Sequence, residues 1–190
     1  MMLTGNSVAG SDMPGIDASE QDLRAYLTGV DPSWLGVTLE IFGLTVLLVF
    51  LVALSRRPAQ SGLRALVLAG GAAGIAVKLA TALPLVAIWL RPEAVDPAVA
   101  GLAIDLGSIG FAAGGALFAL VTAGIAAAGV LPRWLSALGG VASVALLAQV
   151  PLFREEFGLG FLLFMVWTIA AGVVLLRSPA PARAAALQPA

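Results

Sequence analysis

Five long stretches of apolar residues constrain the fold of this chain more than any other feature of its sequence. They cover about residues 34–54, 65–90, 101–128, 131–153 and 159–176. About 20 apolar residues are needed for a helix to cross the hydrocarbon core of a bilayer. The stretches are rich in Ala, Leu and Gly and lack the alternation of a membrane β-barrel. The sequence therefore predicts an all-α, polytopic membrane helix bundle with five transmembrane helices.

The overall composition agrees with this class. Charged residues make up 11% of the 190 residues and hydrophobic residues 60%, whereas a soluble domain carries about 25% charged residues. An ordinary soluble domain is therefore excluded. The chain contains neither Cys nor His, which excludes thiol redox chemistry, Cys/His zinc sites and histidine acid–base catalysis. The few basic residues form no patch for nucleic acid, and no cofactor or metal is expected.

The loops between the apolar stretches fall into two sets of opposite charge. One set contains only basic residues: Arg56, Arg57, Arg64, Arg133, Arg177 and Arg183. The other set contains Arg24, Arg91 and Arg154 together with nine acids: Asp12, Asp17, Glu20, Asp22, Asp31, Glu93, Asp96, Glu155 and Glu156. Basic loops remain on the cytoplasmic side. The N-terminus is thus predicted outside and the C-terminus inside, in the plasma membrane of a bacterial cell.

Three regions follow from this layout. Residues 1–33 form an acidic extracytoplasmic segment, residues 34–177 the five-helix transmembrane domain, and residues 178–190 a disordered cytoplasmic tail. The first 15 residues lack the features of a signal peptide. Asp17-Ala-Ser-Glu20 offers a capping box, which predicts a short surface helix over residues 19–28. Its apolar side (Leu23, Tyr26 and Leu27) is expected to rest on the membrane interface.

Several segments resemble a family of small bacterial integral membrane proteins of unknown function. They are DASEQDLRAYL, DPAVAGLAIDLGSIGFAAGG, LPRWLSALGG and FLLFMVWTIAAGVVLLR. The resemblance covers nearly the whole chain and implies a helical membrane fold, but no activity. Members of that family usually have an additional N-terminal helix, which gives six spans. This chain begins at MMLTGNSVAG, where that helix would be ending, so the helix is expected to be lost or encoded upstream.

Three ionisable side chains fall inside the predicted spans: Glu40, Lys78 and Asp105. A charge at the bilayer centre costs about 2.5–3.5 kcal/mol on insertion scales, so such residues normally find a partner. Counting 1.5 Å per residue along each helix places all three in the outer half of the membrane. The sequence predicts a cluster of Lys78 with Glu40 and Asp105, near Ser108 and the Gln149 amide.

Small residues flank these charges at helical spacing. Gly71, Gly74 and Lys78 share one helix face, as do Gly101, Asp105 and Ser108. Two GxxxG motifs, Gly70–Gly74 and Gly110–Gly114, permit close helix packing. We expect them to seat a neighbouring helix of the same chain, and Pro84 to kink the second span.

Two functions remain open. The charged cluster either fixes the helix register in a structural or accessory membrane subunit, or it binds a proton, a cation or a polar solute in a small transporter. The absence of an inverted repeat and an inner half that is polar only at Thr45, Thr122 and Ser143 favour the accessory subunit. Its partners would be the lipid bilayer and a second copy of the chain or another membrane protein. No catalytic residues are predicted, and the protein is not expected to be an enzyme.

Overall fold

The computed structural model describes residue 14 and residues 18–29, 34–150 and 158–177, and this part of the chain is helical without a β-strand. The elements are α2 (Glu20–Gly29), α3 (Trp34–Ser55), α4 (Ser61–Leu90), the 3-10 turn η1 (Pro92–Ala94), α5 (Pro97–Ala127), α6 (Arg133–Ala148) and α7 (Leu159–Arg177). The all-α prediction is therefore confirmed. Residues 1–13, 15–17 and 30–33 of the predicted acidic segment, residues 151–153 of the fourth predicted span and the predicted tail lie outside the described residues.

Four helices are long and apolar enough to cross a membrane. They are α3, α4, α5 and α7, with mean hydropathies between 1.9 and 2.6. Helix α6 has 16 residues, and at 1.5 Å per residue it is about 24 Å long. That length is shorter than the hydrocarbon core of about 30 Å. The fold is thus compatible with a membrane protein, and the described part of the chain supplies four candidate crossings.

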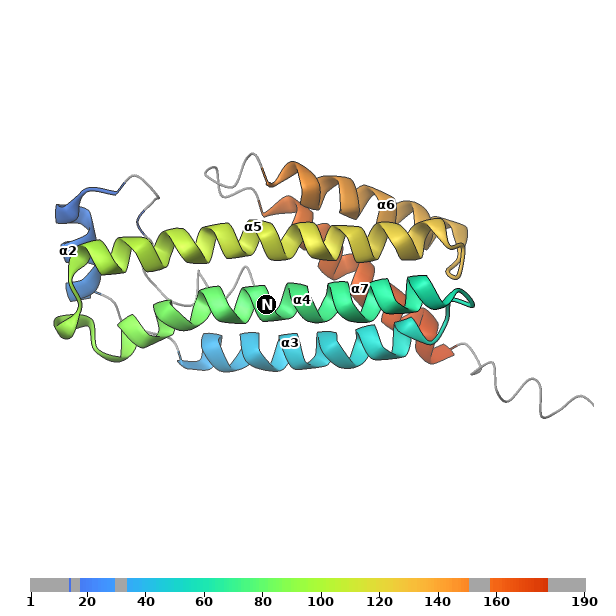
Figure 1. Ribbon diagram of the computed structural model, residues 1–190, viewed down its shortest axis with the longest axis horizontal. Coiled ribbons are helices and arrows are strands. Elements are labelled where there is room, and N and C mark those ends of the chain that lie inside the picture. Colours follow the sequence, from blue (N-terminus) through green and yellow to red (C-terminus); the bar gives the residue numbers. More distant parts are fainter. Residues whose placement is uncertain (1–13, 15–17, 30–33, 151–157, 178–190) are drawn as a thin grey trace, which may run out of the picture.

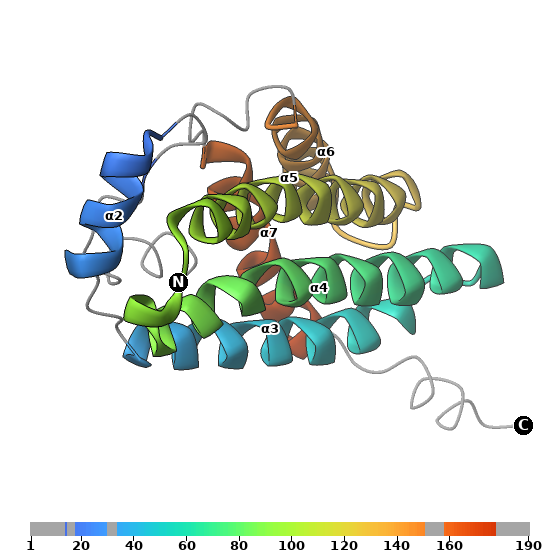
Figure 2. The same ribbon diagram turned by 60° about the vertical axis from the view of Figure 1, so that its left-hand side comes forward.

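Helices α3, α4 and α5 lie side by side, α6 packs on α5, and α7 crosses behind α4 and α5 towards the end of α3 (Figures 1 and 2). The two ends of this bundle differ in charge. Arg56, Arg57, Arg64, Arg133 and Arg177 lie at one end, where α3, α5 and α7 finish and α4 and α6 begin. We call it the arginine end. The described acids Glu20, Asp22, Glu93 and Asp96 lie at the opposite end, with α2 and η1.

The two GxxxG motifs hold α4 and α5 together, as expected for motifs that seat a helix of the same chain. A Cβ atom added to Gly74 would lie 2.8 Å from Cε1 of Phe118, and one added to Gly110 would overlap the side chain of Thr81. Only a glycine fits at either position without a shift of its neighbour. The motifs therefore fix the register of α4 against α5, since Thr81 faces Gly110.

Aromatic side chains join α7 to the rest of the bundle. Trp167 is fully buried, and its indole Nε1 donates a hydrogen bond to the carbonyl oxygen of Leu135 on α6 (3.1 Å). Its ring packs against Phe50 of α3 and Phe164 of α7, with centroids 6.1 and 6.2 Å away. Because buried aromatic rings contribute large apolar areas, this cluster anchors the tilted α7 to α3 and α6.

Helix α2 confirms the predicted short helix to within one residue at each end, but its apolar side was assigned to the wrong surface. Leu23, Tyr26 and Leu27 are buried against Ile88, Ala100, Ala103 and Ile104 of α4 and α5 rather than resting on the membrane interface. Trp89 Nε1 of α4 also donates a hydrogen bond to the Tyr26 hydroxyl oxygen (2.8 Å). The small side chains of Ala100 and Ala103 on α5 allow α2 to pack closely, and α2 covers this apolar surface of α5.

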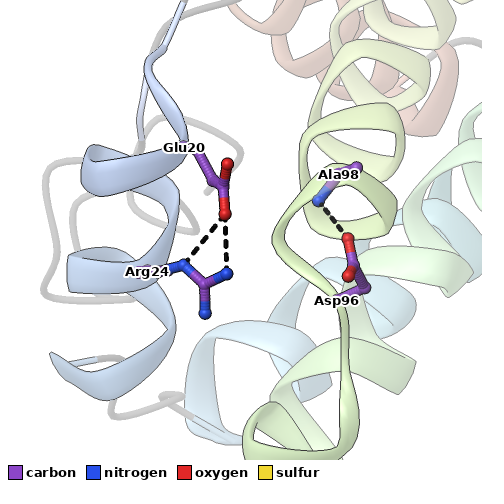
Figure 3. Close-up of polar contacts among 4 residues, drawn as sticks. All are labelled: Glu20, Arg24, Asp96 and Ala98. Atoms are coloured by element: carbon purple, nitrogen blue, oxygen red, sulfur yellow. Dashed lines mark hydrogen bonds and ion pairs between the residues drawn. The ribbon is translucent and has the colours of Figure 1, made fainter.

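The N-terminus of α2 is capped two residues later in the sequence than predicted. Ser19 and Asp22 form the reciprocal pair: the Asp22 N–H donates to Ser19 Oγ (3.2 Å), and the Ser19 N–H donates to Asp22 Oδ2 (3.1 Å). Asp17, the first residue of the predicted box, lies outside the described residues. Glu20, the last residue of that box, instead forms an exposed ion pair with Arg24 (2.6 Å, Figure 3).

Helix α5 begins with a similar device, since the Asp96 carboxylate accepts a hydrogen bond from the Ala98 N–H (2.8 Å, Figure 3). Asp96 is the N-cap residue and Pro97 occupies the first helical position. Asp is favoured as the N-cap because its carboxylate accepts a hydrogen bond from a backbone N–H of the first turn. Pro is favoured at the first helical position because it has no N–H that would be left without an acceptor. The sharp turn out of η1 into α5 follows from this pair.

The Ser19–Asp22 cap predicts how α2 responds to acid. Hydrogen bonds from the Ser19 hydroxyl and N–H hold the pKa of the Asp22 carboxyl below its ordinary value of 3.8. The cap therefore stabilises α2 fully above that value, and its contribution is lost as the pH falls through the lowered pKa. NMR titration of the Asp22 carboxyl carbon is expected to show a midpoint below 3.8 that rises in Ser19→Ala. An equal midpoint in both proteins would contradict the cap.

Candidate functional site

Lys78 lies in the middle of α4, on the buried face that it shares with Gly71 and Gly74. The side chain is directed at α5, where a Cβ added to Gly114 would lie 2.9 Å from Lys78 Cγ. The second glycine of the α5 motif therefore leaves room for the aliphatic stem of the lysine. The long lysine side chain can be buried at this point because position 114 of the facing helix carries no side chain.

The Lys78 ammonium lies against a pair of aromatic rings that contact each other. Its Nζ atom lies 4.3 Å from the ring centroid of Phe111 on α5 and 4.2 Å from that of Phe161 on α7. The two ring centroids are 4.3 Å apart. A cation within about 6 Å of an aromatic face is attracted by the ring quadrupole, most strongly when water is excluded. We call Lys78, Phe111, Phe161 and Gly114 the lysine site.

Glu40 of α3 is the predicted partner that the structure brings into range. Its carboxylate is half-buried, and its negative charge acts on the Lys78 ammonium. Among the described residues these two groups do not form a salt bridge, since the ion pair found there is the one between Arg24 and Glu20. Glu40 therefore favours the buried cation by its charge, without forming an ion pair with it.

Asp105 lies closer to the N-terminus of α5 than the Lys78 side chain can reach. Lys78 lies opposite Gly114, and Asp105 precedes Gly114 by nine residues, or about 13 Å along the helix axis. The lysine stem extends only about 6 Å. Asp105 is half-buried, and the described part of the chain offers it no hydrogen bond or ion pair. The Ser108 hydroxyl donates to the carbonyl oxygen of Ile104 in its own helix (3.1 Å).

Gln149 lies at the end of α6, against the beginning of α7. It is buried, and its Oε1 atom lies 2.5 Å from the position that a Cβ of Gly160 would take. Gly160 directly precedes Phe161, so the amide packs against the first turn of α7. Of the predicted cluster, the structure thus brings Glu40 within electrostatic range of Lys78, places Gln149 against the first turn of α7, and leaves Asp105 nearer the acidic end.

The sequence did not reveal the two phenylalanines of the lysine site. Phe161 and Lys78 belong to helices that are not consecutive, and their meeting depends on the crossing of α7 behind α4 and α5 (Figure 2). Phe111 carried a weak signal, since it precedes Gly114 by about one turn and so lies on a similar face of α5. Spacing alone does not distinguish such a ring from the other apolar residues of a span.

Hydroxyl groups inside the bundle are used by their own helices. Thr81, Thr122 and Ser143 donate to the carbonyl oxygens of Val77, Phe118 and Gly139 at 2.8–2.9 Å. Thr45, which is exposed, bonds in the same way to Ile41. Such local bonds satisfy a hydroxyl donor without linking helices. Within the described ranges no hydrogen-bonded chain of side chains leads from Lys78 to the arginine end, and no three acidic side chains gather as a metal site.

Comparisons of the chain with protein-family models, with curated proteins and with solved structures found no match.

Proposed function

We propose that the protein is a multi-pass membrane protein of the bacterial cell membrane that serves as a structural or accessory subunit and has no catalytic activity of its own. Four long apolar helices support a membrane location. The family resemblance of the sequence supports a bacterial origin and adds no activity. The partners in this proposal are the bilayer and another membrane protein or a second copy of the chain.

The observation that carries the accessory role is the tight packing of buried side chains around Lys78. The ammonium faces two aromatic rings, and the hydroxyls of the spans donate to their own backbones. A carrier needs polar groups that can exchange partners along a path. The described interior has one buried cation, which lies against two aromatic rings, and this is the arrangement expected of a group that fixes helix register.

A small proton- or cation-coupled transporter is the second candidate, and one observation favours it. Lys78 is buried in a membrane-spanning segment, with the charge of Glu40 acting on it. Intramembrane charges are costly and often mark ion pathways. In this alternative, the lysine would release Glu40 and the phenylalanine rings during each transport cycle.

Flux measurements on the full chain in proteoliposomes separate the two candidates. We expect the rate of proton or sodium entry, driven by an imposed membrane potential, to equal that of empty liposomes. Lys78→Met and Glu40→Gln should leave the rate unchanged. A flux above that of empty liposomes that both substitutions abolish would overturn the accessory role and support the transporter.

The proposed topology has five crossings with the N-terminus outside, and α6 is the shortest of them. Because the chain has no cysteine, single-cysteine variants can be labelled without background. A membrane-impermeant maleimide added to whole cells is expected to label Glu93→Cys and Arg154→Cys but not Ala59→Cys. Labelling of Glu93→Cys without Arg154→Cys would mean that α6 does not cross the membrane.

A further inference from the structure

The arginine end is the most strongly charged surface of the described part of the chain. Arg56, Arg57, Arg64, Arg133 and Arg177 gather there, and none of the described acids lies at this end. Arg57 is half-buried, and the other four are exposed. The potential at this surface is thus positive, and it favours a partner with negative charge.

Backbone carbonyls hold two of these arginines in place. Arg57 donates from Nη2 to the carbonyl oxygen of Leu175 on α7 (3.2 Å), and Arg64 donates from Nε to the carbonyl oxygen of Pro58 (2.7 Å). A guanidinium has five N–H donors, so each arginine keeps further donors for a ligand. Ordering a side chain before binding lowers the entropy cost of binding.

Apolar side chains lie directly beside the arginines. Leu68 follows Arg64 by four residues, so both lie on one face of α4, and Leu68 is exposed. Trp134 and Leu176, which adjoin Arg133 and Arg177, are 58% and 90% exposed. A ligand that covers this surface needs an anionic group at the level of the arginines and a hydrocarbon chain that extends along the helices.

We propose that the arginine end binds the phosphate of anionic phospholipid headgroups, with Arg57 and Arg64 as the principal contacts and the acyl chains along Leu68. Guanidinium groups match phosphate oxygens in geometry as well as in charge. Basic residues at the ends of membrane helices attract anionic lipids. This inference rests on the membrane location proposed above, but not on the accessory role.

Native mass spectrometry of the full chain in an uncharged detergent tests the inference. The protein is offered equal amounts of phosphatidylglycerol and phosphatidylcholine with the same acyl chains, and retained lipids are counted. We expect retention of phosphatidylglycerol to exceed that of phosphatidylcholine. The pair Arg57→Gln with Arg64→Gln should weaken it about thirtyfold, because each arginine near an anionic surface contributes about fivefold.

The matched control is the pair Arg24→Gln with Arg91→Gln, which removes the same charge at the acidic end and should keep the preference. If both double variants lost phosphatidylglycerol retention equally, the effect would be explained by net charge alone, and the assigned site would be overturned. If the double variant fails to fold, Arg64→Gln alone can be tested, because Arg64 is exposed. This single variant is expected to weaken phosphatidylglycerol retention about fivefold.

Two further outcomes would overturn the inference. The first is equal retention of the two lipids by the parent protein. The second is displacement of phosphatidylglycerol by inorganic phosphate, but not by sodium chloride of equal ionic strength, which would identify free phosphate as the ligand. Both outcomes leave the cysteine-labelling topology untouched, so failure of the lipid site and failure of the membrane proposal are distinguishable.

Discussion

Replacing Lys78 with glutamate is expected to destabilise the bundle by about 3–5 kcal/mol, the usual cost of an uncompensated buried charge. The carboxylate would face the negative faces of the Phe111 and Phe161 rings, and the charge of Glu40 would repel it. Thermal or denaturant unfolding of the detergent-solubilised chain, followed by circular dichroism, measures the loss. A variant as stable as the parent would contradict the buried position of Lys78.

A charge swap identifies which carboxylate acts on the site. Adding Glu40→Lys to Lys78→Glu restores an attraction between α3 and α4, so we expect part of the lost stability to return. Adding Asp105→Lys should return none, because Asp105 lies about 13 Å farther along α5. Recovery with Asp105→Lys alone would reverse this assignment and support the cluster that the sequence predicts.

Gly110→Ala is the second substitution with a large expected effect, because the added Cβ overlaps the Thr81 side chain. Overpacking of a close interface costs about 1–3 kcal/mol, and here it would separate α4 from α5. The measurement is the free energy of unfolding in detergent. Thr81→Gly in the same chain removes the overlapping atoms, and it should restore much of the stability lost by Gly110→Ala.

Gly140→Ala is the matched control for Gly110→Ala. Gly140 is also in a helix, but nothing lies within 4 Å of its added Cβ. A glycine replaced by alanine in open helical backbone gains about 0.4–1 kcal/mol. We therefore expect Gly110→Ala to lower the free energy of unfolding and Gly140→Ala to raise it. If both lower the stability equally, loss of glycine itself, and not the α4–α5 contact, would explain the effect.

Hydropathy and spacing predict the elements of this fold well. The helices α3, α4, α5 and α7 coincide with predicted apolar stretches, and the buried face of α4 carries the predicted Gly71, Gly74 and Lys78. These features are local properties of the sequence. A membrane span requires a sufficient length of apolar residues, and a helix face requires residues that recur at helical spacing. The sequence of α4 alone is thus enough to predict that Lys78 lies on the same face as Gly71 and Gly74.

The partners of Lys78 could not be predicted in the same way. Depth counted from helix ends placed Asp105 level with Lys78, but the register of α4 and α5 is fixed by the fit of Thr81 against Gly110. That fit sets Lys78 opposite Gly114 instead. The cover that α5 provides for Leu23 and Tyr26 of α2 depends in the same way on three-dimensional packing. Contacts between helices follow from shape complementarity, which the hydropathy pattern does not encode.

Helices α4 and α5 contain 30 and 31 residues and α6 contains 16, so their lengths differ by about 20 Å. In a membrane, lipids beside the long pair and lipids beside α6 therefore meet hydrophobic surfaces of unequal height. Such hydrophobic mismatch is relieved by helix tilt or by local thickening and thinning of the bilayer, at a cost of fractions of a kcal/mol per ångström. If α6 crosses the membrane with the long pair, the bilayer would be deformed unevenly around the bundle, and neighbouring proteins that match the deformed thickness would be drawn to one side of it.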